Sequence, residues 1–349
     1  MRTGGANNSG RIPVGEEGGP VARSGTVRRL SLAAGLVVAG LMLSGCSMSD
    51  LPRFGWPEGV TPQGRHMQYF WSATFIASLC IGVIVWGAMF WAFIAYRKRA
   101  GGPLYPKQTK ENLPFELVCT AIPFVLVAIL FYFTVTVDNK VLAKVPNPAV
   151  TVDVTAFKWN WDFGYEKTKV PGALPSTGDD ASWYNATEIH TVGTTEEIPI
   201  LVLPVNEVIE FHLQSRDVVH SFWVPDFLEK RDVFPDPEAN DTDNVFQVTV
   251  DTEGAFVGRC AELCGTYHSA MNFEVRGVPK PIYQDYITLR ATKDPQTSLP
   301  YTLSAALTQV GKDNPKCAAL CTPHATTTYP FNTKRTAKAS SENPFGSGR

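Results

Sequence analysis

Hydrophobic residues are concentrated in the first 140 positions, whereas apolar and polar residues alternate over much of the remaining chain. Residues 70–96 carry no charged side chain, and residues 115–137 carry only Glu116, near their start. Each stretch exceeds the roughly 20 apolar residues that a helix needs to cross a hydrocarbon core about 30 Å thick. The pattern predicts two transmembrane helices, the first within 69–97 and the second within 114–138.

The segment between the two predicted helices is rich in basic side chains. Together with the last residue of the first helix, the loop at 98–113 contains Arg97, Lys98, Arg99, Lys107 and Lys110. Short loops with an excess of lysine and arginine stay on the cytoplasmic side of a membrane. Residues 46–68, and everything after a linker at 139–146, are therefore expected on the outer face of a bacterial plasma membrane.

A shorter apolar block, residues 30–44, follows two arginines and runs into the sequence LSGC. A basic flank, a short apolar core and small residues at the exit are typical of an export signal, and the block is short for a membrane span. The ending resembles a bacterial lipobox, which predicts a lipoprotein-type signal peptide at 1–45 and a lipid anchor on Cys46. The alternative is an uncleaved helix in which Cys46 is an ordinary thiol.

From residue 147 onward the apolar pattern has a period of two, which is typical of half-buried strands. Valines alternate with polar residues from 150 to 154, and aromatic residues alternate in FKWNWDFGY at 157–165. Further strands are predicted at 197–204, 207–213, 218–225, 244–250 and 271–278. Short strands separated by Pro, Gly, Asn and Asp predict an antiparallel Greek-key sandwich or barrel over 147–291.

Two segments do not follow this pattern. Residues 166–195, rich in Gly, Ser, Thr and Asp, are expected to form a loop inserted between strands, and residues 292–349 an extended polar tail. The net charge of −2 over 349 residues gives no indication of a nucleic-acid partner. The predicted fold class is a two-helix membrane hairpin followed by an all-β domain.

Soft metal ligands are concentrated in the sequence GRCAELCGTYHSAMNFEV at 258–275. Cys260, Cys264, His268 and Met271 offer thiolate, imidazole and thioether groups, a set that suits copper better than zinc or iron. A close cysteine pair in an exported domain forms a disulfide by default, and a site for a single copper or zinc ion is a further alternative. Two thiolates that bridge two copper ions explain why the cluster has a second cysteine.

A second histidine ligand has to come from elsewhere in the chain. His220 lies among apolar residues in RDVVHSFWVP, 40 residues before Cys260. His212 alternates with polar residues on what we expect to be a solvated strand face. One ligand from an early strand and the others from a late loop is the layout of a cupredoxin domain, so the β domain is expected to be cupredoxin-like.

The pattern C-x-E-x-C-x3-H-x2-M, with D-x-x-H-S-x-x-V-P upstream, resembles the binuclear CuA site of cytochrome c oxidase subunit II. That family also has two membrane helices followed by a cupredoxin domain, and the resemblance covers roughly residues 66–290. It implies six ligands, which are Cys260, Cys264, His220, Met271, His268 and the main-chain carbonyl of Glu262. The two cysteines bridge both copper ions. His220 and Met271 complete one copper site, and His268 and Glu262 complete the other.

The resemblance implies roles for two glutamates. The side chain of Glu262 helps to hold a Mg²⁺ or Mn²⁺ ion at the interface with subunit I, and the alternative is a solvated acid in a loop. Glu116 has the family's spacing to T-x-x-P and lies at the mouth of a proton path into subunit I. Its alternative role is to interact with the dipole at the start of a helix.

The segment FKWNWDFGY resembles the aromatic region through which electrons arrive from cytochrome c. The resemblance implies that Trp159 receives the electrons and that Trp161 packs beside it. Both tryptophans share one parity in the strand, so the alternative is that both are core residues. Asp162 and Asp217 are expected to contribute to an acidic docking surface for a basic heme protein, where complementary charge raises the encounter rate.

The tail contains a second cysteine pair, in the sequence KCAALCTPH. Cys317, Cys321 and His324 form a weak pattern for a metal site, and nothing in the family motif covers them. We expect a local disulfide or free thiols.

The resemblance implies that the chain acts as subunit II of an aa3-type cytochrome c oxidase. Such a subunit takes electrons from a soluble or tethered cytochrome c and passes them to heme in subunit I, where O₂ is reduced to water with proton pumping. Subunit III and membrane lipid are further partners, and the hemes lie only in the partner subunit. A quinol oxidase subunit would lack the copper ligands, a nitrous oxide reductase would lack the hairpin, and a copper carrier would have a simpler Cys/His site.

Overall fold

The computed structural model describes residues 35, 53–99, 101, 102, 105, 110–166, 188–194, 197–317 and 319–327. The predicted lipidation site at Cys46 and nearly all of the predicted signal peptide lie outside these residues. So do most of the predicted inserted loop and the end of the tail, from residue 328 onward.

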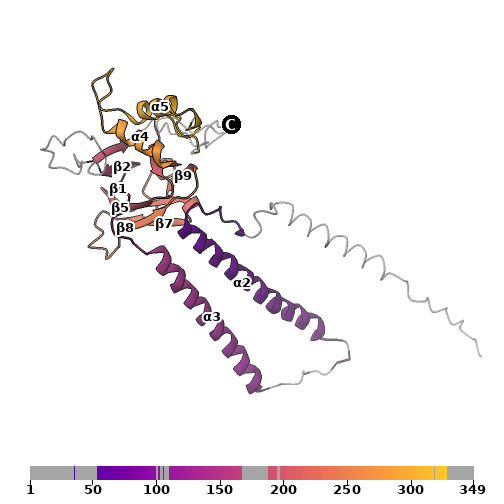
Figure 1. Ribbon diagram of the computed structural model, residues 1–349. Helices are drawn as coiled ribbons and strands as arrows, with labels where there is room; N and C mark the ends of the chain where they lie inside the picture. Colours follow the sequence, from indigo (N-terminus) through magenta and orange to yellow (C-terminus); the bar gives the residue numbers. More distant parts are fainter. Residues whose placement is uncertain are drawn as a thin grey trace, which may run out of the picture. The chain divides into compact units, whose positions relative to one another are not determined.

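Two long apolar helices come first, as predicted. They are α2 (Pro62–Ala95) and α3 (Leu113–Val141) (Figure 1). By length and composition, both could cross a membrane. Polar side chains begin each helix, because the first backbone N–H groups lack partners within it. The Thr61 hydroxyl accepts a hydrogen bond from Gly64 N at 2.9 Å, and the Asn112 side chain caps α3.

The residues just before α2 share hydrogen bonds with the β domain. Val60 N donates to Asp226 O at 3.0 Å, and Asp251 N donates to Val60 O at 3.1 Å. Gly64 is required at this contact, because a Cβ on it would lie 2.6 Å from the carbonyl oxygen of Phe227. The segment just before α2 is therefore bonded directly to the β domain.

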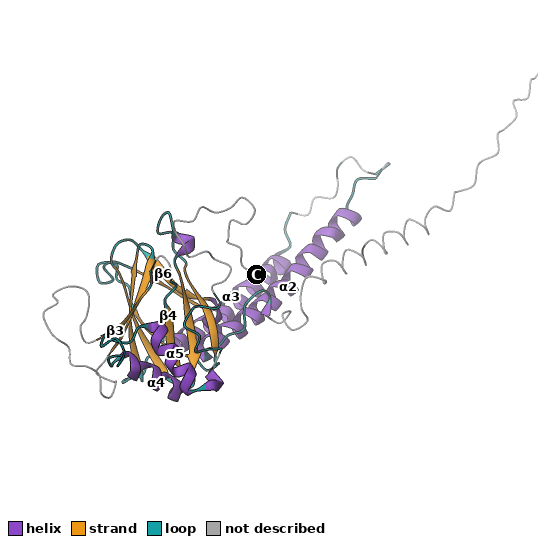
Figure 2. Ribbon diagram, turned by 90° about the horizontal axis from the view of Figure 1, so that it is seen from above, coloured by secondary structure: helices purple, strands orange, loops and turns teal. Residues whose placement is uncertain are grey.

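The described part of the β domain is a sandwich of two five-stranded sheets (Figures 1 and 2). The first sheet has the order β3-β2-β1-β5-β8, and the second has the order β4-β10-β9-β6-β7. The strands are β1 (Val150–Phe157), β2 (Asn160–Glu166), β3 (Glu188–Val192), β4 (Ile200–Pro204), β5 (Val208–Ser215), β6 (His220–Val224), β7 (Glu229–Val233), β8 (Val245–Thr249), β9 (Gly254–Cys260) and β10 (Asn272–Val278). β1 pairs with β5 in parallel, as β4 does with β10, and the other pairs are antiparallel. The sheets are thus mixed rather than purely antiparallel.

The alternating pattern predicted seven of these strands, and three were missed. The confirmed strands are β1, β2, β4, β5, β6, β8 and β10. β3 lies inside the segment predicted to be a loop, where its five residues are surrounded by polar sequence. β7 reads EKRDV and lies at the edge of its sheet, where charged side chains reach water. β9 contains two glycines, which weaken the strand signal.

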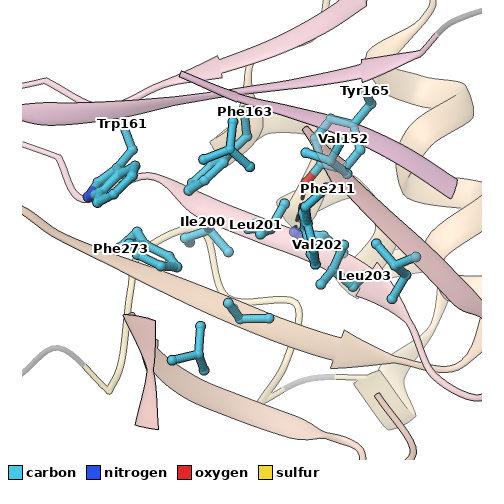
Figure 3. Close-up of a cluster of buried hydrophobic side chains, with 14 of the residues drawn as sticks. Val152, Trp161, Phe163, Tyr165, Ile200, Leu201, Val202, Leu203, Phe211 and Phe273 are labelled. Atoms are coloured by element: carbon cyan, nitrogen blue, oxygen red, sulfur yellow. Dashed lines mark hydrogen bonds between the residues drawn. The ribbon is translucent and has the colours of Figure 1, made fainter. Parts of the chain in front are cut away.

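Aromatic side chains from both sheets meet in the core. Figure 3 shows Trp161 and Phe163 of β2 beside Phe273 of β10, with ring centroids 5.2 Å and 5.4 Å from that of Phe273. The Tyr165 hydroxyl, buried in the same layer, accepts a hydrogen bond from Val202 N at 2.8 Å. Large buried rings contribute much of the apolar burial that stabilises such a domain. This core connects the strands that carry the candidate ligands.

The described part of the C-terminal segment is folded, so the prediction of an extended tail is wrong up to residue 327. α4 (Lys280–Arg290) packs against β4, and α5 (Leu303–Asp313) packs against α4 (Figure 2). The buried face of α5 consists of Ala306, Leu307 and Val310. Beyond it, Cys317 and Cys321 form a disulfide, one of the two outcomes expected for this pair. A short apolar face of helical spacing is hard to detect within so polar a composition.

Candidate metal centre

Sheet pairing brings the ends of three strands together around the predicted ligands. His220 begins β6, Cys260 ends β9, and Met271 immediately precedes β10. β9 pairs with both of the other strands, with Phe222 opposite Cys260 and Asn272 opposite Arg259. The connection from β9 to β10, residues 261–271, carries the remaining candidates; we call it the metal loop.

All six predicted donor groups lie close together. The Cys260 sulfur is 3.8 Å from the Cys264 sulfur, 3.8 Å from His220 Nδ1 and 3.3 Å from the carbonyl oxygen of Glu262. The Cys264 sulfur is 3.5 Å from His268 Nδ1 and 3.8 Å from Met271 Sδ. A disulfide needs sulfur atoms about 2.05 Å apart, so the Cys260–Cys264 disulfide alternative does not fit.

Backbone hydrogen bonds hold this arrangement in place. Cys260 N donates to Met271 O at 3.0 Å, which closes the base of the metal loop, and Ala261 N donates to Ser221 O at 3.1 Å. The indole N–H of Trp161 also donates to Met271 O, at 3.4 Å. Both ends of the metal loop are therefore fixed to the sheets.

His220 is oriented by Asp217, three residues earlier. Its side chain is fully buried, and its Nε2 lies 2.8 Å from a carboxylate oxygen of Asp217, which leaves Nδ1 facing Cys260. Asp217 also accepts hydrogen bonds from the N–H groups of Lys158 and Val218, each at 2.7 Å. Metal-binding histidines commonly hold their second nitrogen in this way. The D-x-x-H spacing contains the signal for this role, which sequence reasoning missed.

The electrostatics of this pair favour a neutral imidazole. Burial lowers the pKa of His220 and outweighs the raising effect of the Asp217 carboxylate. Burial opposes ionisation of Asp217, but hydrogen bonds from His220 and from two backbone N–H groups hold the pKa of that carboxyl below its usual value. A neutral ring with an ionised partner on Nε2 presents the Nδ1 lone pair to a cation.

The two thiols are buried, and their chemistry suits a soft cation. Burial, followed by the nearby Cys260, raises the pKa of Cys264 to about 12. Without a cation the thiol therefore stays protonated, and a metal has to displace its proton. The donor set combines two buried thiols, a buried and a partly buried imidazole and a buried thioether, so these residues fit copper.

Trp159 and Trp161 have different surroundings, although they share one parity in the sequence. Trp161 lies within β2 and is fully buried in the core. Trp159 lies in the turn between β1 and β2 and is only partly buried, with its indole N–H donating to Cys264 O at 3.1 Å. Its ring lies 5.0 Å from that of Tyr267 and packs on Gly265, whose positive φ of 118° suits glycine.

Asp162 is not at the surface, so its predicted contribution to a docking surface is wrong. Only 2% of it is exposed, and its carboxylate lies 3.0 Å from His190 Nδ1 on the neighbouring strand β3. β3 was not predicted; it pairs with the edge of β2 and places His190 beside this carboxylate.

The remaining predicted residues lie away from the sulfur cluster or at its edge. The side chain of Glu262 is partly exposed. Glu116 lies in the first turn of α3 and accepts a hydrogen bond from Asn112 N at 3.1 Å, which matches its alternative role at a helix start. His324 is exposed and lies 3.7 Å from Glu197, so it does not gather with the bonded Cys317 and Cys321.

Sequence comparisons with known proteins show which family the chain belongs to. A family model described as cytochrome c oxidase subunit II, periplasmic domain, matches residues 150–278. The probable cytochrome c oxidase subunit 2 of Nocardia farcinica is 44% identical over 90% of each chain, and cytochrome c oxidase subunit 2 of Corynebacterium glutamicum is 41% identical over 92% of this chain and 97% of its own. The solved periplasmic domain of subunit II of the Bradyrhizobium japonicum cytochrome oxidase is 25% identical, with a TM-score of 0.29 over 41% of this chain and 94% of that chain. The chain therefore belongs to the cytochrome c oxidase subunit II family.

Proposed function

We propose that this chain is the copper-containing subunit II of an aa3-type cytochrome c oxidase. It accepts electrons from cytochrome c and passes them to heme in subunit I, where O₂ is reduced to water and protons are pumped. The convergence of six donor groups around the Cys260 and Cys264 sulfurs carries the proposal. Relatives with this name, aligned over nine-tenths of the chain, support it.

Cys260 and Cys264 would hold two copper ions between them, and copper would supply one-electron redox chemistry there. His220 and Met271 would be the further ligands of one copper, and His268 and the carbonyl oxygen of Glu262 those of the other. The short distances from the cysteine sulfurs to these donors support a site made of all six groups. Because both ends of the metal loop are bonded to the sheets, the ligands would move little on electron transfer.

Trp159 is the residue at which electrons from cytochrome c enter. It is the tryptophan that combines partial exposure with a hydrogen bond to the backbone of a copper-binding cysteine. Trp161 supports the site from within the core through its bond to Met271 O. Asp217 acts chiefly on His220, and its partly exposed carboxylate adds negative charge near the docking surface.

The other proposed roles concern the rest of the oxidase. The Glu262 side chain contributes to a Mg²⁺ or Mn²⁺ site shared with subunit I, and Glu116 lies at the mouth of a proton path into that subunit. The β domain lies on the outer face of a bacterial plasma membrane, with Cys46 lipid-anchored and subunits I and III as partners. Mass spectrometry of the mature N-terminus tests the anchor, because an unmodified peptide that spans Gly45 and Cys46 contradicts it.

A copper count on the purified full chain in detergent tests the central proposal. We expect two copper ions per chain, with the near-infrared absorption and electron paramagnetic resonance spectrum of a mixed-valence pair. His268→Gln removes one ligand and should abolish these spectra. His212→Gln changes a histidine on another strand and should leave them intact. Fewer than two copper ions per wild-type chain contradicts the binuclear site.

A further inference from the structure

Two charged side chains on β10 are completely buried close to the metal centre. Glu274 and Arg276 have exposed side-chain fractions of 0%, and Arg276 Nε lies 2.8 Å from Glu274 Oε1. They alternate with Phe273 and Val275, which pack in the core between the sheets, so the pair faces the opposite side of its sheet. Burying two charges is costly unless their remaining hydrogen-bonding groups are also satisfied.

Backbone carbonyls from the C-terminal segment satisfy the guanidinium. Arg276 donates to the carbonyl oxygen of Leu320 at 2.9 Å, to that of His324 at 2.6 Å and to that of Thr322. Three carbonyl dipoles thus point at one positive charge. We call residues 320–327 the C-terminal clamp.

The end of the same clamp satisfies the carboxylate. Glu274 Oε2 accepts hydrogen bonds from Thr326 N at 2.6 Å, from Thr327 N at 2.7 Å and from the Thr327 hydroxyl at 2.7 Å. The eight residues of the clamp therefore present hydrogen-bond acceptors to the Arg276 guanidinium and then hydrogen-bond donors to the Glu274 carboxylate. Hydrogen bonds to charged groups are stronger than those between neutral groups, so this match is specific to a buried ion pair of this orientation.

The clamp is itself fastened to the domain. The Cys317–Cys321 disulfide closes the turn at its start, and both cysteines are buried. A Cβ on Gly311 of α5 would lie 3.2 Å from the Cys321 Cβ, so this turn packs closely on the helix. The segment that the sequence predicts to be a tail is thus secured at the start of its contact with β10.

Because β10 begins directly after Met271, we infer that the C-terminal clamp positions this metal ligand. Glu274 lies three residues beyond Met271, and Glu274 N is bonded to Pro199 O at 3.0 Å. The clamp holds Glu274 from one side and β4 and β9 hold β10 at its edges, which fixes Met271 Sδ beside the Cys264 sulfur. Glu274 and Arg276 are positioning residues that act through Met271. The copper part of this inference rests on the proposed function.

The double substitution Glu274→Gln/Arg276→Met in the full chain tests the inference. It removes both charges at similar side-chain volume, and it leaves the clamp's carbonyl and N–H groups without their ionic partners. We expect hydrogen exchange of the backbone amides at 271–275 to accelerate about tenfold or more. We also expect the near-infrared band and the midpoint potential of the copper-loaded chain to shift while two copper ions remain bound.

A matched control is Glu207→Gln/Lys280→Met. This pair has a separation of 2.6 Å, it is partly exposed, and Lys280 lies beyond the other end of β10. This control also removes one negative and one positive charge, but it should change neither the hydrogen exchange of the amides at 271–275 nor the near-infrared spectrum. If the double variant does not fold, Thr327→Val removes a single hydroxyl from Glu274, and an acceleration of about threefold is expected.

The outcomes separate this inference from the proposed function. Unchanged exchange at 271–275 in the variants overturns the clamp. Faster exchange with an unchanged band and potential shows that the clamp stabilises the strand without positioning Met271, which also overturns the inference. If the wild-type chain binds no copper, the proposed function fails. Hydrogen exchange of the Met271 backbone amide then still decides whether the C-terminal clamp holds Met271 in place.

Discussion

Cys260 and Cys264 are separated by three residues, as are Cys317 and Cys321, yet in this structure only the second pair is bonded. The first pair spans the end of a strand and the metal loop, with its sulfurs 3.8 Å apart and donors from His220, His268 and Met271 around them. The second pair lies in a tight turn with a Cα–Cα distance of 5.5 Å, well suited to a disulfide. Equal spacing therefore leaves the chemistry open, and the surrounding groups determine it.

Substitution of a cysteine in the metal loop should have the largest effect. In Cys264→Ser the site loses the sulfur that we propose to bridge the copper ions and that lies close to both His268 and Met271. Since a hydroxyl does not replace a thiolate toward copper, we expect loss of the mixed-valence spectrum and a fall of at least about 100-fold in the rate of cytochrome c oxidation by the assembled oxidase. A variant that keeps the wild-type spectrum contradicts the bridging role.

Asp217→Asn should weaken copper binding without removing a ligand. The amide keeps the size of the side chain but loses the negative charge beside His220 Nε2. Removal of such a partner costs about 10- to 100-fold in metal affinity. Competition with a chelator measures the copper affinity. Asp153→Asn, which alters an aspartate beside His212, serves as the control. Equal copper affinity in the Asp217 and Asp153 variants argues against an orienting role.

The second cysteine pair should affect stability rather than copper content. Replacing both cysteines by serine, Cys317→Ser/Cys321→Ser, opens a very short loop. We expect a loss of about 2 kcal/mol in the free energy of unfolding, because the disulfide restricts the unfolded chain. Denaturant unfolding measures this, and copper content should stay at the wild-type level. Loss of copper from this variant would make the two pairs functionally alike and break the comparison.

The metal centre and the C-terminal segment also differ in how much of their structure could be predicted from the sequence. The resemblance of the spaced motifs to a known family implied all six donors of the metal centre, and the structure brings these groups together. The D-x-x-H spacing offered Asp217 as the partner of His220, but the direction in which its carboxylate points depends on the fold. The burial of Asp162 depends on β3, a short strand within polar sequence. The clamp on Arg276 consists of backbone groups, which no pattern of side chains reveals.

Trp159→Phe tests whether Trp159 acts in electron entry without affecting copper binding. Phenylalanine keeps an aromatic ring but loses the N–H that donates to Cys264 O at 3.1 Å. We expect the rate of electron transfer from cytochrome c to fall about tenfold, with copper content unchanged. Stopped-flow reduction of the copper centre measures the rate. An unchanged rate would mean that electrons reach the copper by another route.

A pair of histidines extends the comparison, with the smallest expected effect. His212, like His220, is bonded to carboxylates, but its side chain is 41% exposed, whereas that of His220 is fully buried. The hydrogen bond to Asp153, opposed by partial burial and helped by Glu210, raises the pKa of His212 to about 9. A folded-state pKa above the unfolded value of about 6.5 means that protonated His212 stabilises the fold fully below about pH 6.5. That contribution is lost as the pH rises through 9.

His212→Gln should therefore lower the free energy of unfolding at pH 6 by about 0.5 kcal/mol, a value kept small because solvent screens an exposed pair. At pH 9.5 the difference from the wild-type chain should be close to zero, because the wild-type ring has lost its proton there. Urea unfolding of both chains in detergent at the two pH values measures the change. A difference that is the same at both pH values would show that His212 acts through its shape and hydrogen bonds rather than its charge. The comparison with His220 would then rest on burial alone.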